Sequence, residues 1–567
     1  MVASSDERSL AGALARLDDA ALAHVLTLRG VSPEASWHDF FDAAEGLLSP
    51  VSVDRALTAL PRDLLRALAD GRDVTGLRDR MLLRPDDGQA FAVVTARLRE
   101  LSTGVVSAAE PADPAPADGQ QTAAAAEHAF TAVAAITDVL LWALGSPVAR
   151  TGAGTVAVAD RRRLIDAGAV GDGDELEDLI AAAADAGLLR DLGRSWHATA
   201  EAERWTGLPT PERWAAVAQA FADALPQGLR TPAGGFASPL GWREAYPLDP
   251  AWPEQAARLL RRAERLGLLA PDGTEPAWTR ALRETGTLDP TALAPHLPTE
   301  IDRIYLQADL SAIAPGPLLP QIERRLRGMA VRESRAQAST YRFSPESIAA
   351  AVAAGETAES LREFLATISL TGIPQPLAYL VDRAASRHGR LRVGVDEETG
   401  NTIVLSDDAD LLATVAVDQA LRPVGLVPAG GRLVSRAPRD AVYWSLFDAR
   451  YPVVAVDGDG DGRALQRHGA DPAPHPPTGL ERYARLIAEL RTHQGPDAEG
   501  AWLERELEQA VRNRTVMEVT VRLPDGSTRT FQLEATGLGG GRLRGRDRGA
   551  DVERTLPLSS IESARPV

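Results

Sequence analysis

Every permanently charged basic side chain of this sequence is an arginine, which limits the chemistry open to the chain. The 567 residues contain 61 arginines and no lysine. A Walker A loop needs a lysine ammonium as a mobile point charge on the nucleotide phosphates, and arginine replaces it poorly. Protein-kinase phosphate binding, pyridoxal Schiff bases and amine nucleophiles need the same group. The sequence therefore excludes a P-loop motor and predicts that the chain does not hydrolyse ATP.

Two groups of arginines have a spacing that suits phosphate contacts. The first group, which we call the helical stripe, consists of Arg258, Arg261, Arg262 and Arg265. Its i, i+3, i+4, i+7 spacing places the four side chains on one face of a helix. The second group, which we call the strand stripe, consists of Arg542, Arg544 and Arg546, whose alternation places them on one face of a strand. The alternative for both stripes is a solvated surface without a ligand.

The charge of the chain makes local arginine groups necessary for any contact with nucleic acid. The net charge is −18, so most of the surface repels phosphate. Residues 511–567 depart from this average, because they hold ten arginines against seven acidic residues, a balance of +3. We therefore predict that DNA, if bound, contacts the two stripes.

The other signals for chemistry in the sequence are weak. There is no cysteine, which excludes disulfides, thiolate metal sites and cysteine nucleophiles. The nine histidines lack zinc-binding spacing. The repeat Asp457–Gly462 matches the first half of a calcium loop, but His468 stands where the loop needs a glutamate, so we interpret it as an acidic turn. The sequence predicts no catalytic residue, no metal and no cofactor.

The sequence shows no pattern typical of a targeting signal or a membrane span. The first ten residues are polar, unlike a signal peptide. The most apolar stretch, Phe130 to Leu144, is too short to span a bilayer and carries Asp138. We expect a soluble, cytoplasmic protein that does not contact a membrane.

Length and composition predict several domains, because 567 residues exceed a single core. Residues 102–127 are rich in Ala, Pro and Asp and lack a periodic apolar face, which is typical of a disordered linker. A second, shorter linker is predicted from Ala470 to Gly479. The predicted units are a helical domain at 1–100, a linker at 101–128, winged-helix-like segments at 129–300, a module at 301–468, a linker and helix at 469–510, and a β-barrel at 511–567.

The region from 129 to 300 repeats one pattern, in which a helix ending in Gly-Leu-Leu runs into a short hairpin. The first copy is Asp174–Leu189 followed by a strand at Ser195–Thr199. The second is Trp252–Leu269 followed by a strand at Ala277–Thr279. This order is typical of winged helices, with helical repeats as the alternative. The first helix has no basic residue and is predicted to contact protein, whereas the second carries the helical stripe.

Residues 301–396 contain the most specific pattern in the chain. A Tyr-x-Phe strand at 341–343 is followed by Ser-Pro-x-Ser, where Ser344 is expected to cap a helix that ends near Gly355. A Gly-x-Pro break follows at 372–374, and the strand Gly-Arg-Leu-Arg-Val closes the run at 389–393. This stretch resembles the N-terminal domain of the XPB/Ssl2 family of repair and transcription helicases. Each matched residue also has a structural role in a cap, turn or core.

The resemblance implies an accessory protein, because in XPB helicases two motor domains follow this domain and here none does. The family domain also contacts the winged-helix accessory subunit of TFIIH, and winged-helix segments ahead of an XPB-like module are similar to that arrangement. By this analogy the expected partner is an XPB-like helicase.

The last 57 residues read as four short strands joined by glycine-rich turns. They predict a small curled barrel that looks like the WYL domain of bacterial regulators, which is Sm-like. No Trp-Tyr-Leu run is present, and the cluster Gly539–Gly541 joins two strands, so it is not a dinucleotide fingerprint.

Taken together, the sequence predicts an α+β multidomain protein that is mainly helical. The first functional hypothesis is a non-enzymatic accessory or DNA-binding protein that acts with a repair helicase. The second is a winged-helix transcriptional regulator with a WYL-like C-terminal domain. Stimulation of a partner's ATPase would favour the first hypothesis, and binding of palindromic DNA by a dimer would favour the second.

Overall fold

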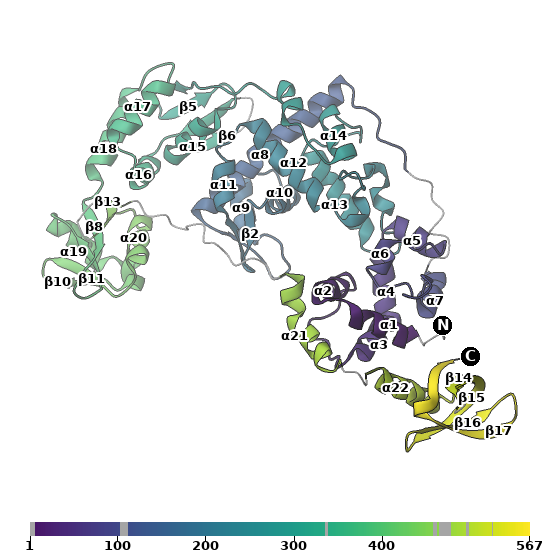
Figure 1. The fold of residues 1–567 in the computed structure, drawn as a ribbon. Coiled ribbons are helices and arrows are strands. Elements are labelled where there is room, and N and C mark those ends of the chain that lie inside the picture. The colour runs from purple at the N-terminus through teal and green to yellow at the C-terminus, as the bar shows by residue number, and fades with distance from the viewer. Residues whose placement is uncertain are drawn as a thin grey trace.

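The computed structural model describes residues 6–101, 111–334, 338–457, 462–463, 478–494, 498–523 and 526–566. These residues form an α+β multidomain fold in which four separate sheets lie among helices. In Figure 1 the domains follow one another along an arch. The N-terminal helices and the C-terminal sheet lie at one end of the arch, and β8 to β13 lie at the other.

The first domain combines helices from both ends of the chain. Its N-terminal helices are α1 (Asp6–Arg16), α2 (Asp19–Leu28), α3 (Phe40–Leu48), α4 (Pro50–Thr58), α5 (Arg62–Ala69), α6 (Thr75–Arg78) and α7 (Ala92–Leu101). The helix α21 (Gly479–Thr492) packs against α2 and buries Tyr483, Leu486 and Leu490 in the same core. The hydroxyl of Tyr483 donates to the carbonyl of Val31 at 2.8 Å. The helix predicted within 469–510 is therefore part of the N-terminal domain.

A single long helix, α8 (Gly119–Gly145), begins inside the segment that the sequence predicts as a linker. Asp118 caps it, and Ala125, Ala126 and Ala129 are buried along its first half. Alanine is the best helix former and lets helices pack closely, so a run without large apolar residues can still form a core helix. The predicted linker 101–128 is thus corrected from Gly119 onward, and its residues 102–110 lie outside the described part.

The residues just before α8 are also held in place. Ala117 donates its backbone N–H to the carbonyl of Glu275 at 2.9 Å, and Glu275 donates to Ala115 at 2.8 Å. Among the described residues, α8 is the one helix long and apolar enough to cross a membrane, but 56% of its most apolar window is buried inside the fold. Burial of this extent is typical of the central helix of a domain.

Helices α8 to α14 form a tandem unit with two similar halves. The first half contains β1 (Val148–Ala149), α9 (Val158–Asp166), α10 (Gly173–Asp185), β2 (Leu189–Asp191) and β3 (Ser195–Ala198), followed by α11 (Ala200–Trp205). Its strands pair in the order β1-β3-β2. The second half contains α12 (Thr210–Ala224), the 3₁₀ turn η2 (Pro239–Glu244), α13 (Trp252–Arg265) and α14 (Ala277–Thr285).

The predicted strand at Ala277–Thr279 is wrong, because these residues begin helix α14. Trp278 and Leu282, four residues apart, are both buried, and this is helical spacing. A tight turn from Ala270 to Thr274 precedes the helix, with the N–H of Ala270 donating to Thr274 at 2.9 Å.

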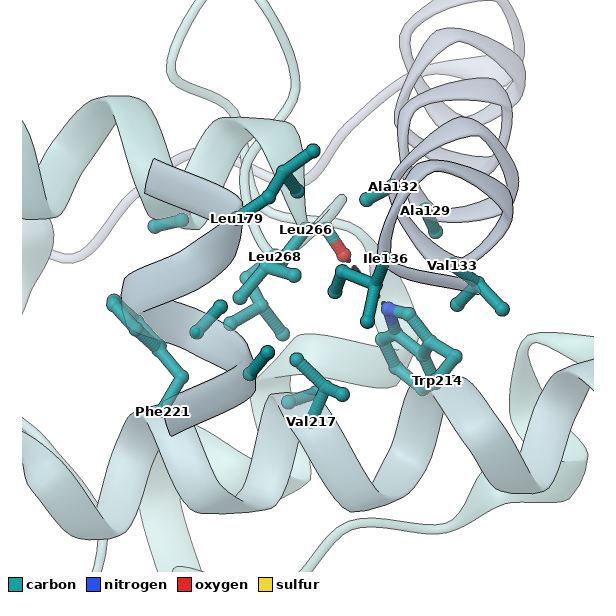
Figure 2. Close-up of a cluster of buried hydrophobic side chains, with 14 of the residues drawn as sticks. Ala129, Ala132, Val133, Ile136, Leu179, Trp214, Val217, Phe221, Leu266 and Leu268 are labelled. Atoms are coloured by element: carbon teal, nitrogen blue, oxygen red, sulfur yellow. Dashed lines mark hydrogen bonds between the residues drawn. The ribbon is translucent and has the colours of Figure 1, made fainter. Parts of the chain in front are cut away.

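The two halves share one hydrophobic core (Figure 2). Ala129 and Ile136 of α8 meet Leu179 of α10 and Val217 of α12 in this core. The indole N–H of Trp214 donates to the carbonyl of Leu266 at 2.7 Å, at the end of α13. Because each half supplies part of one core, the tandem unit is a single domain.

The helicase-like pattern folds into a four-stranded sheet covered by helices. The strands are β4 (Tyr305–Leu306), β5 (Ser311–Ala314), β6 (Val331–Ser334) and β7 (Ser339–Arg342), in the order β4-β5-β7-β6. The helices are α15 (Pro320–Met329), α16 (Pro345–Ala353), α17 (Ala358–Ile368) and α18 (Gln375–Arg387). The predicted cap is confirmed, because Ser344 and Ser347 form a reciprocal capping box at the start of α16.

A separate core follows within the module predicted at 301–468. Its sheet contains β8 (Leu391–Val395), β9 (Thr402–Leu405), β10 (Val427–Ala429), β11 (Arg432–Ser435), β12 (Val453–Val456) and β13 (Gly462–Arg463), in the order β10-β11-β9-β8-β12-β13. The helices α19 (Ala409–Val417) and α20 (Arg439–Asp448) cover one face. The predicted module therefore consists of two domains joined after α18. Residues 458–461 of the acidic turn predicted at 457–462 lie outside the described part of the chain.

The C-terminal domain is an open sheet packed on α22 (Ala498–Asn513). Its strands are β14 (Val516–Arg522), β15 (Thr528–Gly539), β16 (Arg542–Asp547), β17 (Val552–Pro557) and β18 (Ile561–Pro566). The order is β17-β16-β15-β14-β18, so β17 and β18 lie at opposite edges of an open sheet and the predicted small curled barrel is not closed. Leu503 and Leu507 of α22 cover the buried face of the sheet, which supplies the core without closure.

Candidate functional site

The helical stripe lies on α13, and the structure brings acidic side chains to it. Arg262 pairs with Asp185 at 2.9 Å, and Arg265 and Arg261 pair with Asp178 at 3.1 and 3.8 Å. Both carboxylates belong to α10, the acidic helix of the first half. The two helices with opposite charges therefore pack against each other, and three members of the helical stripe contact carboxylates.

Burial controls the electrostatics of this seam between α10 and α13. The side chain of Asp178 is only 6% exposed, and desolvation raises its pKa although three arginines act in the opposite direction. Burial also raises the pKa of Asp185 against the influence of Arg262. The fourth member of the stripe, Arg258, is half-exposed and pairs with Glu254 of its own helix at 2.6 Å.

The strand stripe lies on β16 with its predicted alternation confirmed. Arg542, Arg544 and Arg546 are exposed, and the residues between them are buried. Arg546 pairs with Asp551 at 2.7 Å, which together with the nearby Glu534 and Glu553 raises the pKa of its guanidinium. Arg542 and Arg544 make no ion pair among the described residues.

The backbone beside the strand stripe leaves these arginines accessible. Arg542 lies opposite Gly539, and Arg544 lies opposite Gly537 on β15. On the other side, Arg544 lies opposite Thr555 of β17. With glycine and a small polar residue as neighbours, an approaching phosphate meets little steric hindrance. The strand stripe is therefore the better placed of the two predicted stripes for an anionic ligand.

A buried ionic junction joins the tandem unit to the domain of β4 to β7. Arg327 and Arg332 both contact Asp138, whose side chain is 2% exposed in the middle of α8. Nearby, Arg213 of α12 donates to Thr137 and Thr210, both at 2.9 Å. The two domains border a cleft of about 850 Å³. The charge of Asp138, which the sequence marks as an obstacle to membrane insertion, serves this junction.

A second cleft, of about 620 Å³, lies between the domain of β4 to β7 and the domain of β8 to β13. Helices α16 and α18 form one wall, and the end of α20 with the start of β12 forms the other. Arg450 reaches across it to Glu346, with 3.6 Å between the charged groups. We call this the interdomain cleft.

The sequence reasoning missed the interdomain cleft because its walls come from two domains. One local signal was available, since Arg450 follows α20 at a position where helices usually end in glycine. No group of three or more acidic or histidine side chains that could hold a metal is found among the described residues.

Comparison with known families identifies one part of the chain. Residues 304–429 match the family described as helicase conserved C-terminal domain. The matched segment covers the domain of β4 to β7 and the first strands of the following domain, so this part of the chain is a helicase-related domain. No curated protein matches the chain.

Proposed function

We propose that this chain is a non-enzymatic, cytoplasmic accessory protein that acts with an XPB/Ssl2-type repair helicase and contacts DNA through local arginines. The observation that carries the proposal is a helicase-related domain within a chain that has no lysine. A helicase motor needs the phosphate-binding lysine, so this chain cannot supply the motor itself. A helicase-related domain without a motor fits an accessory role.

The tandem unit supports this proposal. Its first half has the order helix, strand, helix, helix, strand, strand, which is typical of a winged helix. Its second half contains α12, η2 and α13, followed by the turn at 270–274 and then α14. We propose that both halves are winged helices, placed ahead of a domain of the XPB N-terminal type, as in the accessory subunit that the resemblance implies.

The arrangement of α10 and α13 is less favourable to the alternative, a winged-helix transcriptional regulator. In such proteins the third helix enters the major groove of DNA. Here the two helices at that position pair with each other through Asp178, Asp185 and three arginines. A regulator would then have to read DNA through the C-terminal domain, for which the strand stripe offers phosphate contacts without base recognition.

The decisive experiment mixes the purified full chain with an XPB-like ATPase from the same cell. We expect the two proteins to co-purify at mild salt, the chain to stimulate DNA-dependent ATP hydrolysis by its partner, and the chain alone to show no turnover. A helicase of another family is the matched control and should not bind. A folded, abundant chain that neither retains nor stimulates the ATPase would contradict the proposal, and binding of palindromic DNA by a dimer would favour a regulator.

A further inference from the structure

The interdomain cleft combines cationic, aromatic and small side chains around one space. Its volume of about 620 Å³ falls in the range of small-molecule sites. The small apolar side chains of Ala349 and Ala353 on α16 and of Ala384 on α18 line one wall, and Phe447 and Tyr451 line the other. Aromatic side chains facing small apolar ones offer stacking and van der Waals contact to a planar ring.

Arg450 occupies an unusual backbone position at the edge of this cleft. Its φ of 65° lies in the left-handed region, which costs a non-glycine residue roughly 1 kcal/mol. The side chain is 80% exposed and therefore gains no packing in return. Strain of this kind is found at functional sites, and here it aims a guanidinium across the cleft.

Glu346 acts as an internal anion in the cleft. Backbone N–H donation at the start of α16 lowers the pKa of Glu346, with help from the Ser344 hydroxyl and the charge of Arg450. Its carboxylate is therefore ionised and lies 3.6 Å from Arg450. Arg383 of α18, on the same wall as Glu346, also lines the cleft and makes no ion pair among the described residues. An external anion that displaced Glu346 would meet the guanidinium of Arg450, with Arg383 in the same lining and Asp448 as the remaining carboxylate there.

The aromatic wall is fixed in place before any ligand arrives. The hydroxyl of Tyr451 donates to Asp418 at 2.8 Å, which orients its ring. Phe447 is stacked with Tyr443, with 6.3 Å between ring centroids, and meets Trp444 edge to face at 5.5 Å. Phe447 and Tyr451 remain half-buried, so part of each ring can contact a base. Rigid rings beside arginines are the usual platform for single-stranded nucleic acid.

We propose that the interdomain cleft binds one nucleotide of a single DNA strand, with its phosphate on Arg450 and Arg383 and its base between the alanine wall and Phe447. Glu346 holds Arg450 in the free protein and is displaced by the phosphate. This inference rests on one part of the proposed function, the contact with DNA, and assigns a site to that contact. It adds a binding site outside both arginine stripes.

The test measures the affinity of the full chain for fluorescent oligo-dT as a function of salt. We expect Arg450→Gln to lower the affinity about fivefold and to reduce the slope of log affinity against log salt by about 0.7, the value for one phosphate on a single strand. The control Arg99→Gln removes the same charge from an exposed site on α7 and should have little effect. Glu346→Gln should raise the affinity about twofold, and Glu398→Gln, in an exposed turn, should not.

A glycine variant separates charge from folding. Arg450→Gly should keep or raise the melting temperature, because glycine suits the left-handed backbone, and should still lose affinity for oligo-dT. Normal binding by this variant would overturn the site while leaving DNA binding by the chain intact. Absence of oligo-dT binding by the wild type would overturn both the site and the DNA contact. Binding of a poly-glutamate peptide in place of oligo-dT, with the same loss in Arg450→Gly, would assign the cleft to an acidic protein partner and overturn the inference.

Discussion

The helical stripe and the strand stripe are equally regular in sequence, yet they have different surroundings. On α13 three arginines contact carboxylates of α10, and Arg262 is only 16% exposed. On β16 all three arginines are exposed, and only Arg546 has a carboxylate partner among the described residues. One stripe holds two halves of a domain together, while the other leaves two guanidinium groups open to ligands.

This difference shows what residue spacing does and does not determine. Helical or alternating spacing places side chains on one face, because that follows from the backbone geometry alone. What lies opposite that face depends on the tertiary fold. The acidic side chains of α10 carry a charge that repels phosphate, and the same charge makes this helix the partner of the arginines on α13.

The largest effect that we expect is loss of stability in the tandem unit. Replacing Arg261, Arg262 and Arg265 with Gln leaves Asp178 and Asp185 buried without a countercharge. The free energy of unfolding of this domain should fall by roughly 2–4 kcal/mol, somewhat less than for fully buried pairs. Hydrogen exchange of peptides from α10 and α13 measures this loss locally, which suits a multidomain chain.

The matched control for this variant is Arg258→Gln, which removes an arginine of the same stripe. Arg258 pairs only with Glu254, an exposed partner on its own helix, so its loss should cost about 0.5 kcal/mol or less. An equal loss of stability in the control would show that the ion pairs with α10 do not stabilise the domain. A large fall in DNA affinity of the triple variant, with unchanged hydrogen exchange, would show that the helical stripe binds DNA as the sequence alone suggests.

The sequence predicted local features well because adjacent residues determine them. The N-cap at Ser344, the strand at Tyr341 and the alternation along β16 depend only on neighbouring residues. Contacts between distant segments could not be predicted. Tyr483 packs into a core with Val31, which lies more than 400 residues earlier in the chain. No residue pattern in either segment indicates that the two are in contact.

The errors in the prediction have the same origin. The alanine-rich start of α8 lacks large apolar residues, so its burial depends on how closely neighbouring helices approach. The sequence predicts the short C-terminal strands, but closure of a barrel depends on the curvature of the whole sheet, and here α22 covers the core of an open sheet. The interdomain cleft depends on two domains at once, and only the backbone of Arg450 marks it locally.

A second prediction concerns the strand stripe, where DNA affinity should change and stability should not. Replacing Arg542 and Arg544 with Gln should alter the free energy of unfolding by no more than about 0.5 kcal/mol, because both are exposed and lack ion pairs among the described residues. Affinity for DNA of any sequence should fall, and the salt slope should decrease by about 1–2. Salt-dependent fluorescence anisotropy measures both quantities.

Arg546→Gln is the control on the same strand, because Asp551 already neutralises that arginine. It should change the salt slope less than either Arg542→Gln or Arg544→Gln. If all three single variants reduced the slope equally, the ion pair with Asp551 would not distinguish the members of the stripe, and the contrast between paired and unpaired arginines would fail.

The smallest expected effect is a pH dependence of opposite sign in the two regions. Burial raises the pKa of Asp178 above its ordinary value of 3.8, so the folded tandem unit binds a proton more tightly than the unfolded chain. Its contribution to stability therefore increases as pH falls through the raised pKa. In the C-terminal sheet, hydrogen bonding from Arg554 lowers the pKa of Asp547. The stabilisation by Asp547 is present above 3.8 and is lost as pH falls below that value.

Two asparagine variants test this contrast by peptide-resolved hydrogen exchange between pH 7 and 3, after correction for the intrinsic exchange rate. Relative to wild type, Asp178→Asn should protect α10 and α13 best at pH 7, because the amide carries no charge to desolvate, and this advantage should disappear in acid. Asp547→Asn should weaken protection of β16 at pH 7, and its cost should disappear below about pH 3.8. If both variants changed with pH in the same direction, desolvation would not dominate at Asp178, and the seam would be an ordinary ion pair like that of Asp547 with Arg554.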